Sequence, residues 1–594
     1  MKKFLSFCLS ASLIVSTAFI SACTPTLYTD DVPVIQKDEG LRVHAVINST
    51  DTQAWHLWQS VHDEYLKVEN PSEKYFFLPS SADEKFADIY NAYSEEVILN
   101  GVSIKPDTTE KFEYKVNTPY EVKVKDQTFS LRFMKSNAEA AVFINNQSAG
   151  GNGTDLFSYL NDENNNADKS LSAAASGAII DSDGNIDNTP ITKIKGRGNT
   201  SWDKSKKSYN VTYENDVSVA GMKKGKKYSL LANYQDDSLS RNRFLYDLAD
   251  AVDVPYASDS RYTDLYINGF YCGSYQMCEK VAAGKNSLVN DISTISYLNA
   301  NGSVKKDFPF LCEADPGINK DKDYFVETDG GYVVIKYPEL KKDDKGYEQV
   351  KEYVAEKYNA FFNAASSKKD LSSVGDIDSL SKLYLINELG KNWDSGVSST
   401  YFVYKPDASG KYKFFGSPVW DYDNALGNAT GVEEELEYFN IKDYEQYTGW
   451  WCRYKGGSDN IINRLSQNPE ILNSSKTIWF DKFVPAINHF SGESKSEKLN
   501  AELYTNAELY TSEKYYSLIK DSAEMNYKSG WLLNTGDWIA DHSSLTKATF
   551  DTKTKKMITD QKAASYNSDF TGMYNYCRDW TISRAAWLSQ EFSK

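Results

Sequence analysis

The most apolar stretch of this 594-residue chain lies at its N-terminus. It runs from Phe4 to Ile20, follows Lys2 and Lys3, and is interrupted only by Ser and Thr. A positively charged start, a short apolar segment and small residues before a cleavage point are the features of a secretory signal peptide. Later segments contain no run near the ~20 apolar residues that a membrane-spanning helix needs. We therefore expect the rest of the chain to fold in water.

The end of this segment indicates how the protein is held after export. Ile20-Ser21-Ala22-Cys23 resembles the bacterial lipobox, which implies cleavage before Cys23 and addition of diacylglycerol and palmitate-like acyl chains to Cys23. Several acyl chains on one residue anchor a protein firmly, whereas one chain binds only marginally. We expect residues 1–22 to be a leader, residues 23–40 a tether, and the protein an exported lipoprotein of the cell membrane or outer membrane, facing outside the cytoplasm. The alternative is an ordinary secretory signal with Cys23 as an accidental thiol.

Charge and composition exclude several classes of function. The net charge is −17, and removal of Lys2 and Lys3 with the leader makes it −19, so a nucleic-acid partner is not expected. The five histidines form no H-E-x-x-H pair, no G-x-S-x-G elbow is present, and the spacing of the five cysteines after Cys23 fits no zinc site.

Hydrophobic periodicity divides the remainder into regions. Residues 41–136 predict a small Ig-like β-sandwich. A hairpin is expected around Asp126-Gln127, because apolar residues alternate on both sides of it: Val122, Val124, Phe129, Leu131 and Phe133. Residues 149–190 are rich in Gly, Asn, Ser and Ala and predict a long loop or partly disordered insertion.

From residue 191 the pattern predicts an α+β fold. Predicted strands are 191–213 (two, around Gly196–Trp202), 228–233, a hairpin over 262–281 centred on Asn268-Gly269, 401–404 and 412–415. Predicted helices are Asp236–Val252, 346–364 and a segment from the cap Asp376 to Lys391, and residues 430–594 are expected to be mostly helical.

Carboxylates gather at the ends of predicted elements between Asn392 and Gly427. Asp394 follows a helix, and Asp421 and Asp423 follow an apolar strand. Such oxygens suit Mg²⁺, which usually takes one or two carboxylates together with phosphate oxygens. A further carboxylate could accept a hydroxyl proton. Two alternatives remain: a solvated acidic turn, and the acid/base pair of a carbohydrate-active enzyme, formed by Asp394 with Asp421 or Asp423.

A second group of residues, I-K-G-R-G-N-T-S-W-D-K-S-K-K-S-Y at 194–209, concentrates positive charge. Gly196 and Gly198 allow a tight turn between strands, whose N–H groups could face an anion. The third glycine of a G-x-G-x-x-G loop is absent, so this signal alone is weak. The run G-M-K-K-G-K at 221–226 is one residue short of a P-loop.

These motifs occur in a particular order that resembles one family. The order is G-R-G-N-T-S-W (196–202), K-K-S-Y (206–209), L-L-A-N-Y-Q-D (230–236), S-R-N (240–242), Y-I-N-G-F-Y-C-G-S-Y-Q-M-C-E-K (266–280), N-W-D-S (392–395), W-D-Y-D (420–423) and I-S-R-A-A-W-L (582–588). The chain resembles the CotH kinase family over about residues 140–594.

The resemblance implies an atypical protein-kinase-like, two-lobed domain with a core at 191–429 and a helical C-terminal part at 430–594. It implies transfer of the γ-phosphoryl group of ATP to Ser or Thr hydroxyls of a protein acceptor, with Mg²⁺ or Mn²⁺. By the same resemblance Asp394 is the catalytic aspartate, and Asp421 and Asp423 hold the metal. The implied nucleotide-binding residues are Arg197, Lys206, Lys207, Glu279 and Trp420.

The sequence departs from the family pattern after Asp394. The family often has an asparagine before the following strand, where this chain has Ser399-Thr400, and a hydroxyl is a poorer Mg²⁺ ligand than an amide oxygen. The alternative function is therefore a cell-surface module that has lost catalysis and recognises polysaccharide or protein. Aromatic residues make up 14% of the chain and include 42 tyrosines, which suits sugar stacking as well as ordinary core packing.

Overall fold

The structure is a computed structural model that describes most of the chain after residue 72. The described residues are 40–44, 58–60, 73–146, 148–150, 153–315, 323–367, 370–428, 437, 441, 444–453, 459–492, 509–531 and 543–594. Cys23, the expected leader and nearly all of the expected tether lie outside them. No helix among the described residues is long and apolar enough to cross a membrane.

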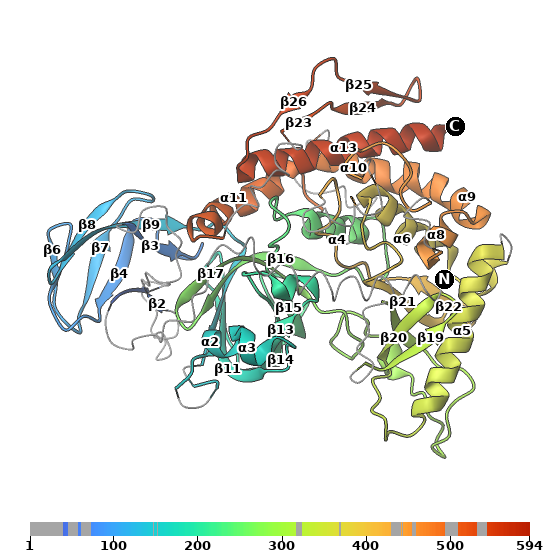
Figure 1. Cartoon of the computed structure of the whole chain (residues 1–594), viewed down its shortest axis with the longest axis horizontal. Helices are drawn as coiled ribbons and strands as arrows, with labels where there is room; N and C mark the ends of the chain where they lie inside the picture. The colour runs from blue at the N-terminus through green and yellow to red at the C-terminus, as the bar shows by residue number, and fades with distance from the viewer. Residues whose placement is uncertain are drawn as a thin grey trace.

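Two small sheets form the N-terminal end of the molecule (Figure 1). One has the order β2-β1-β4-β7, from Trp58–Ser60, Leu41–His44, Phe86–Asn91 and Thr109–Glu113. The other has the order β3-β9-β8-β5-β6, from Glu73–Leu78, Gln127–Lys135, Tyr120–Val124, Val97–Leu99 and Val102–Ile104. They share one apolar core, as a β-sandwich does, because alternate residues such as Ile89 and Phe133 point inward.

The predicted hairpin of this region is confirmed. β8 and β9 pair antiparallel with Val124 opposite Gln127, so the turn lies at Lys125-Asp126.

The sandwich also packs on the next sheet: Phe77 and Tyr271 stack with centroids 4.8 Å apart, and the Tyr266 hydroxyl donates to the Phe77 carbonyl at 2.8 Å.

An eight-stranded sheet occupies the middle of the molecule (Figure 1). Its order is β10-β16-β17-β15-β14-β13-β11-β12, from Ala140–Asn145, Ser260–Ile267, Phe270–Glu279, Gly225–Leu231, Ser208–Val217, Ile191–Arg197, Ser172–Asp181 and Ile186–Asn188. The predicted hairpin at Asn268-Gly269 is confirmed, because both residues have positive φ (52° and 85°) between paired strands β16 and β17.

The prediction of a loop or disordered insertion at 149–190 is wrong. This region contains α2 (Leu156–Asn161), α3 (Glu163–Asn166), β11 and β12, and β11 pairs with both β10 and β13. Its small residues serve packing: a Cβ on Gly177 would lie 2.8 Å from Ile191 Cδ1. Low hydrophobicity here reflects close approach between strands, which local periodicity does not reveal. The sheet therefore begins well before residue 191.

A five-stranded sheet follows, with the order β19-β20-β18-β21-β22, from Phe325–Thr328, Gly331–Tyr337, Phe310–Ala314, Thr400–Pro406 and Tyr412–Gly416. Helices α5 (Tyr347–Ser367) and α6 (Ile377–Gly390) pack on it, close to their predicted ranges. The predicted cap is confirmed, because the Asp376 side chain accepts from the Ser379 N–H at 2.9 Å.

Helix α4 (Arg241–Ala251) begins five residues later than predicted. The Asp236 carboxylate accepts from the N–H groups of Ser238 and Arg241, at 3.0 and 2.9 Å, and so holds residues 236–240 in a turn. Local side-chain bonding of this kind competes with helix formation.

The described C-terminal part is mainly helical, as expected. It contains α8 (Ile461–Leu465), α9 (Pro469–Ile478), the π-turn Trp479–Phe483, α10 (Val484–Phe490), α11 (Ser512–Lys528) and α13 (Phe570–Ser593), with short strands β23 (Ser544–Leu545), β24 (Ala548–Asp551), β25 (Lys556–Thr559) and β26 (Ala564–Ser565). Helix α13 lies across α6 and α10 (Figure 1). The fold is thus α+β, with a large core shared by α4, the five-stranded sheet and these helices.

Candidate functional site

The loop that carries Asp421 and Asp423 follows β22 and is held by the start of helix α4. The Asn242 side-chain oxygen accepts from the Tyr422 N–H at 2.7 Å, and Arg241 Nε donates to the Ala425 carbonyl at 2.9 Å. Both anchoring side chains are buried. The S-R-N motif at 240–242 therefore positions the two aspartates and does not itself form the site.

The loop that carries Asp394 begins where α6 ends. Lys391 adopts a left-handed conformation that stops the helix. The Trp393 N–H then donates to the Asn424 carbonyl at 3.1 Å, so the residues next to Asp394 and Asp423 are bonded to each other. The sequence prediction that these carboxylates gather in one place is supported by this bond.

The acidic group, defined as Asp394, Asp421 and Asp423, carries strongly interacting charges. The pKa of Asp423 is raised to about 8, first by burial and then by the negative charges of Asp421, Asp394 and Asp236. Like charges in one place disfavour ionisation, and a bound cation would relieve that cost. The raised pKa favours the protonated form of Asp423 when no cation is bound.

Asp421 and Ser399 both have positive φ, 67° and 49°, which is uncommon for residues other than glycine. The Ser399 hydroxyl donates to Asp421 Oδ2 at 3.2 Å, and the Asp421 N–H donates to the Tyr246 hydroxyl at 3.3 Å. Ser399, the residue where the chain departs from the family pattern, thus contacts the expected metal ligand directly.

These residues fit a hard divalent cation that takes few protein ligands. No three His, Cys, Asp or Glu side chains in the described ranges are grouped closely enough to hold a metal on their own. Beside Asp423, however, the Asn424 side-chain oxygen is buried and has no hydrogen-bond partner among the described residues. Asn424 follows Asp423 in the chain, and an amide oxygen together with carboxylates is a kind of donor that suits Mg²⁺ or Mn²⁺ completed by phosphate oxygens.

Arg197, from the end of β13, joins the glycine-containing motif to the acidic group. Its guanidinium carbon lies 5.6 Å from the centroid of the Trp420 ring, next to Asp421. The glycines on either side have packing roles: a Cβ on Gly196 would lie 2.3 Å from the Trp202 ring, and Gly198 has φ +95°. Two motifs that are over 200 residues apart therefore meet at Arg197 and Trp420.

Three other predicted nucleotide-binding residues are not brought to this place. The Lys206 ammonium is buried and donates to the carbonyls of Ala232 and Ser274 and, at 2.8 Å, to Asn526 Oδ1, and burial lowers its pKa to about 7. Lys207 Nζ donates to the Trp202 carbonyl at 2.6 Å. Both lysines thus stabilise the fold around β14.

Glu279 lies on the face of the eight-stranded sheet opposite to Arg197. It is paired with Tyr228, whose side chain belongs to the core on that opposite face. Burial raises the pKa of Glu279 to about 7, although the Asp259 N–H donates a hydrogen bond to its carboxylate that lowers this pKa. The strand alternation instead places its neighbour Lys280 on the Arg197 face.

Lys169 is a residue that the sequence analysis missed. Its ammonium donates to the Gly198 carbonyl at 2.6 Å and to Asn199 Oδ1 at 3.3 Å. Burial lowers the pKa of Lys169, and the nearby positive charges of Lys195 and Arg197 add to that effect. It lies in the region mistaken for a loop, where no local pattern marks it.

The C-terminal motif I-S-R-A-A-W-L was also left without a role. Arg584 and Glu388 form an ion pair of 2.7 Å with both side chains fully buried. The same carboxylate accepts from the N–H groups of Trp451 and Cys452, at 2.6 and 2.9 Å. The pair fixes α13 to the end of α6, immediately before the Asp394 loop.

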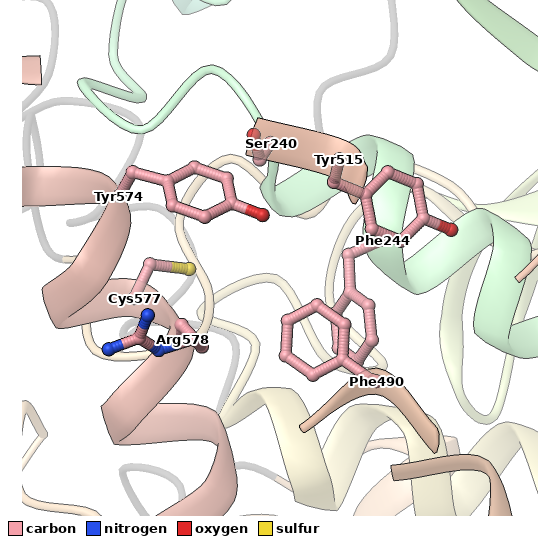
Figure 2. Close-up of a pocket in the computed structure, with 7 residues that line it drawn as sticks. All are labelled: Ser240, Phe244, Phe490, Tyr515, Tyr574, Cys577 and Arg578. Atoms are coloured by element: carbon pink, nitrogen blue, oxygen red, sulfur yellow. The ribbon is translucent and has the colours of Figure 1, made fainter. Parts of the chain in front are cut away.

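Figure 2 shows a cavity away from the acidic group, where Tyr574, Cys577 and Arg578 of α13 face Phe244, Phe490, Tyr515 and Ser240. Its volume is about 10 Å³, room for one water at most. The rings of Phe244 and Phe490 pack at a tilt, with centroids 4.1 Å apart, so the cavity is a packing gap and not a substrate site.

The comparison with protein families decides the classification. The model of the family described as CotH kinase protein matches residues 194–588, more than half of the chain. The chain belongs to the CotH kinase family. The match begins inside β13 and ends in α13, so this family region includes Arg197, the acidic group and Arg584. A search of curated proteins finds no match.

Proposed function

We propose that this CotH family member is an atypical protein kinase that transfers the γ-phosphoryl group of ATP to Ser or Thr hydroxyls of a protein acceptor. The observation that carries the proposal is the Trp393–Asn424 hydrogen bond, which joins the Asp394 loop to the Asp423 loop beside Arg197. Phosphoryl transfer needs positioning, a divalent metal, a cation on the phosphates and a carboxylate for the acceptor hydroxyl. We further propose a kinase-like two-lobed layout, with the eight- and five-stranded sheets in different lobes.

Each residue has a distinct part in this proposal. Asp421 and Asp423 would hold Mg²⁺ or Mn²⁺, and the bound metal would neutralise charge on the β- and γ-phosphate oxygens. Asp394 would orient the acceptor hydroxyl and take its proton. Arg197 and Lys169 would supply the positive charge that was expected of Lys206 and Lys207. Trp420 holds the Arg197 guanidinium in place.

The proposal is tested by nucleotide binding together with group transfer. ATP with Mg²⁺ or Mn²⁺ should raise the unfolding temperature, because a ligand at 100 times its Kd stabilises the folded state by about 2.7 kcal/mol. ATP labelled at the γ-phosphate should label a protein acceptor, whereas ATP labelled at the α-phosphate should not. Stabilisation without γ-transfer to any acceptor would contradict the kinase proposal.

The contact between Ser399 and Asp421 favours a second candidate function. The hydroxyl occupies one oxygen of the expected metal ligand, 3.2 Å away. A chain with this arrangement could retain the fold as a surface module for polysaccharide or protein and lack transfer. In that case millimolar ATP with either metal would leave the unfolding temperature unchanged.

We also propose that the mature protein begins at Cys23 and is lipid-anchored outside the cytoplasm. The basis is the lipobox-like sequence Ile20-Ser21-Ala22-Cys23. Membrane fractionation with fatty-acid labelling should find the wild type lipidated and Cys23→Ser unlabelled and released or mislocalised. A labelled, membrane-bound serine variant would contradict the anchor.

A further inference from the structure

A buried lysine and a buried asparagine meet where helix α11 packs on β17 of the eight-stranded sheet. Lys206 lies two residues before β14, and Asn526 lies near the end of α11. Lys206 Nζ is 2.8 Å from Asn526 Oδ1. Because a C=O bond is about 1.2 Å long, Nζ lies within about 4 Å of the Asn526 carboxamide carbon. The amine and the carbon with which it could form an amide are therefore neighbours.

The Asn526 carbonyl group is polarised by its surroundings. Its Oδ1 accepts from the Ser274 N–H at 3.1 Å as well as from Lys206. An N–H group aimed at a carbonyl oxygen stabilises the negative charge that develops there when a nucleophile adds to the carbon. Gly273 makes this close approach possible, because a Cβ there would lie 2.5 Å from Asn526 Oδ1 and 2.9 Å from Lys206 Cε.

The Lys206 amine is prepared to act as a nucleophile. Burial lowers its pKa to about 7, so a large share of the amine is neutral near neutral pH. A neutral amine has two hydrogens, and the carbonyls of Ala232 and Ser274 can accept both. The lone pair is then left for Asn526, the third polar neighbour of Nζ. The Tyr275 ring closes another side, with its centroid 4.5 Å from Nζ.

Asp264 provides a buried carboxyl group that can carry a proton. It is paired with Ser274 across β16 and β17. Its Oδ1 accepts from the hydroxyl of Ser522, one helical turn before Asn526, at 2.7 Å, whereas its Oδ2 has no hydrogen-bond partner in the described part of the chain. Asp264 and Lys206 act on each other's charge, and burial raises the pKa of Asp264 to about 6. The carboxyl group can therefore gain and release a proton near neutral pH.

We propose that Lys206 and Asn526 become joined by an isopeptide bond, with Asp264 as the proton carrier. The Nζ lone pair attacks Cγ of Asn526, the Nζ–Cγ bond forms and the Cγ–Nδ2 bond breaks. One proton passes from Nζ through Asp264 to Nδ2, which leaves as ammonia. Asp264 is regenerated, and the reaction uses no oxidant, reductant or further reactant. The proposal does not rest on the proposed kinase activity.

Such a bond would supply a cross-link of a kind that the cysteines do not. The five cysteines in the described ranges are all free and buried. A bond between Lys206 and Asn526, 320 positions apart, would fasten α11 covalently to the eight-stranded sheet. Cross-linking of distant residues stabilises a protein mainly by restricting its unfolded chain.

Mass spectrometry of the full wild-type chain tests the proposal without any substitution. Trypsin cleaves after Lys204, Lys207, Lys520 and Lys528 but not after an acylated Lys206, so the digest should contain residues 205–207 joined to residues 521–528. The mass of this branched peptide should equal the sum of its two parts less one ammonia. Recovery of peptide 521–528 separate and unmodified in full yield would overturn the proposal. Loss of ammonia confined to peptide 521–528 would also overturn it, since an asparagine that cyclises with its own backbone loses ammonia too.

Variants assign the part of each residue. Lys206→Met and Asn526→Ala should each abolish the branched peptide. Lys207→Met is the matched control, because this adjacent buried amine donates to the Trp202 carbonyl, and the variant should keep the bond in a correspondingly longer peptide. Asp264→Asn keeps the shape of the side chain and should form the bond at least about 100 times more slowly after synthesis, the loss of a general acid and base. A branched peptide from Asn526→Ala would overturn the bond, and a wild-type rate for Asp264→Asn would overturn the role of Asp264.

Discussion

The guanidinium of Arg197 lies over the ring of Trp420, with its central carbon 5.6 Å from the ring centroid. A cation over an aromatic face contributes about 0.5–2 kcal/mol, depending on its exposure to water. The ring of Tyr246 stacks on the ring of Trp420, with centroids 5.7 Å apart. This contact orients a cation that borders both the glycine-containing turn and the acidic group.

Arg197→Ala should therefore weaken binding of Mg·ATP by about 10- to 100-fold, because it removes a charge-assisted contact worth about 1.5–3 kcal/mol. Arg197→Lys should recover part of the affinity, since the charge remains and the planar group is lost. Calorimetry checks both variants. An unchanged Kd for Arg197→Ala would exclude Arg197 from the nucleotide site.

Lys206→Met should give the opposite result. Its ammonium is enclosed by two carbonyls and Asn526 Oδ1, and each buried acceptor left without a donor costs about 1–3 kcal/mol. We expect a lower free energy of unfolding and an ATP affinity equal to that of the wild type, at a temperature where the variant is folded. A stable variant with weakened ATP affinity would restore Lys206 to the nucleotide site.

Asp423 should make stability depend on pH in metal-free protein. Its pKa is about 8 in the folded state against an ordinary aspartate value of 3.8, so between these values the folded state favours a proton that the unfolded chain has released. Stability contributed by this group therefore falls as pH rises from about 4 to 8, by at most about 1.4 kcal/mol per pH unit. Chemical unfolding in EDTA at several pH values should show Asp423→Asn gaining stability relative to wild type over this range.

Asp407 provides a control of opposite sign. The Ser409 hydroxyl and neighbouring N–H groups lower its pKa, so its contribution is present above the unfolded-state pKa and is lost as pH falls. Asp407→Asn should thus lose stability relative to wild type as pH rises toward about 4, and the difference should stay constant above that pH. If Asp423→Asn and Asp407→Asn change in the same direction, the charge assignment of Asp423 is wrong.

Arg584→Leu should destabilise the protein by about 3–5 kcal/mol, because it leaves Glu388 buried without its partner. Lys594 caps the end of the same helix and pairs with Glu591, and its side chain is 64% accessible to water. Lys594→Ala should therefore have little effect. Thermal unfolding compares the two variants. Equal effects would show that α13 is not held through Arg584.

Local signals in the sequence predicted local structure correctly. Asn268-Gly269 forms the expected turn because positive φ at both positions is a property of those two residues. Asp376 caps α6 because its partner is three residues away. Asp394, Asp421 and Asp423 were grouped because they follow predicted elements, and their roles came from the family resemblance; the structure brings their loops together.

Long-range contacts explain what the sequence did not reveal. Lys206 bonds to residues 26, 68 and 320 positions away, so a basic run looked like a phosphate site although its lysine is buried. The same holds for β11, whose small residues fit beneath Ile191, and for Lys280, whose face depends on its pairing across β15.

The central claim is that Asp421 holds the metal while Asp394 serves the acceptor hydroxyl. The most direct measurement is calorimetric Mg·ATP binding beside γ-phosphoryl transfer, for wild type, Asp421→Ala and Asp394→Asn. Asp421→Ala should lose both metal-dependent binding and transfer. Asp394→Asn should bind Mg·ATP with nearly wild-type affinity and transfer ~10²–10⁴ times more slowly, the usual contribution of a general base. Retention of transfer by both variants, or equal loss of nucleotide binding in both, would contradict the account.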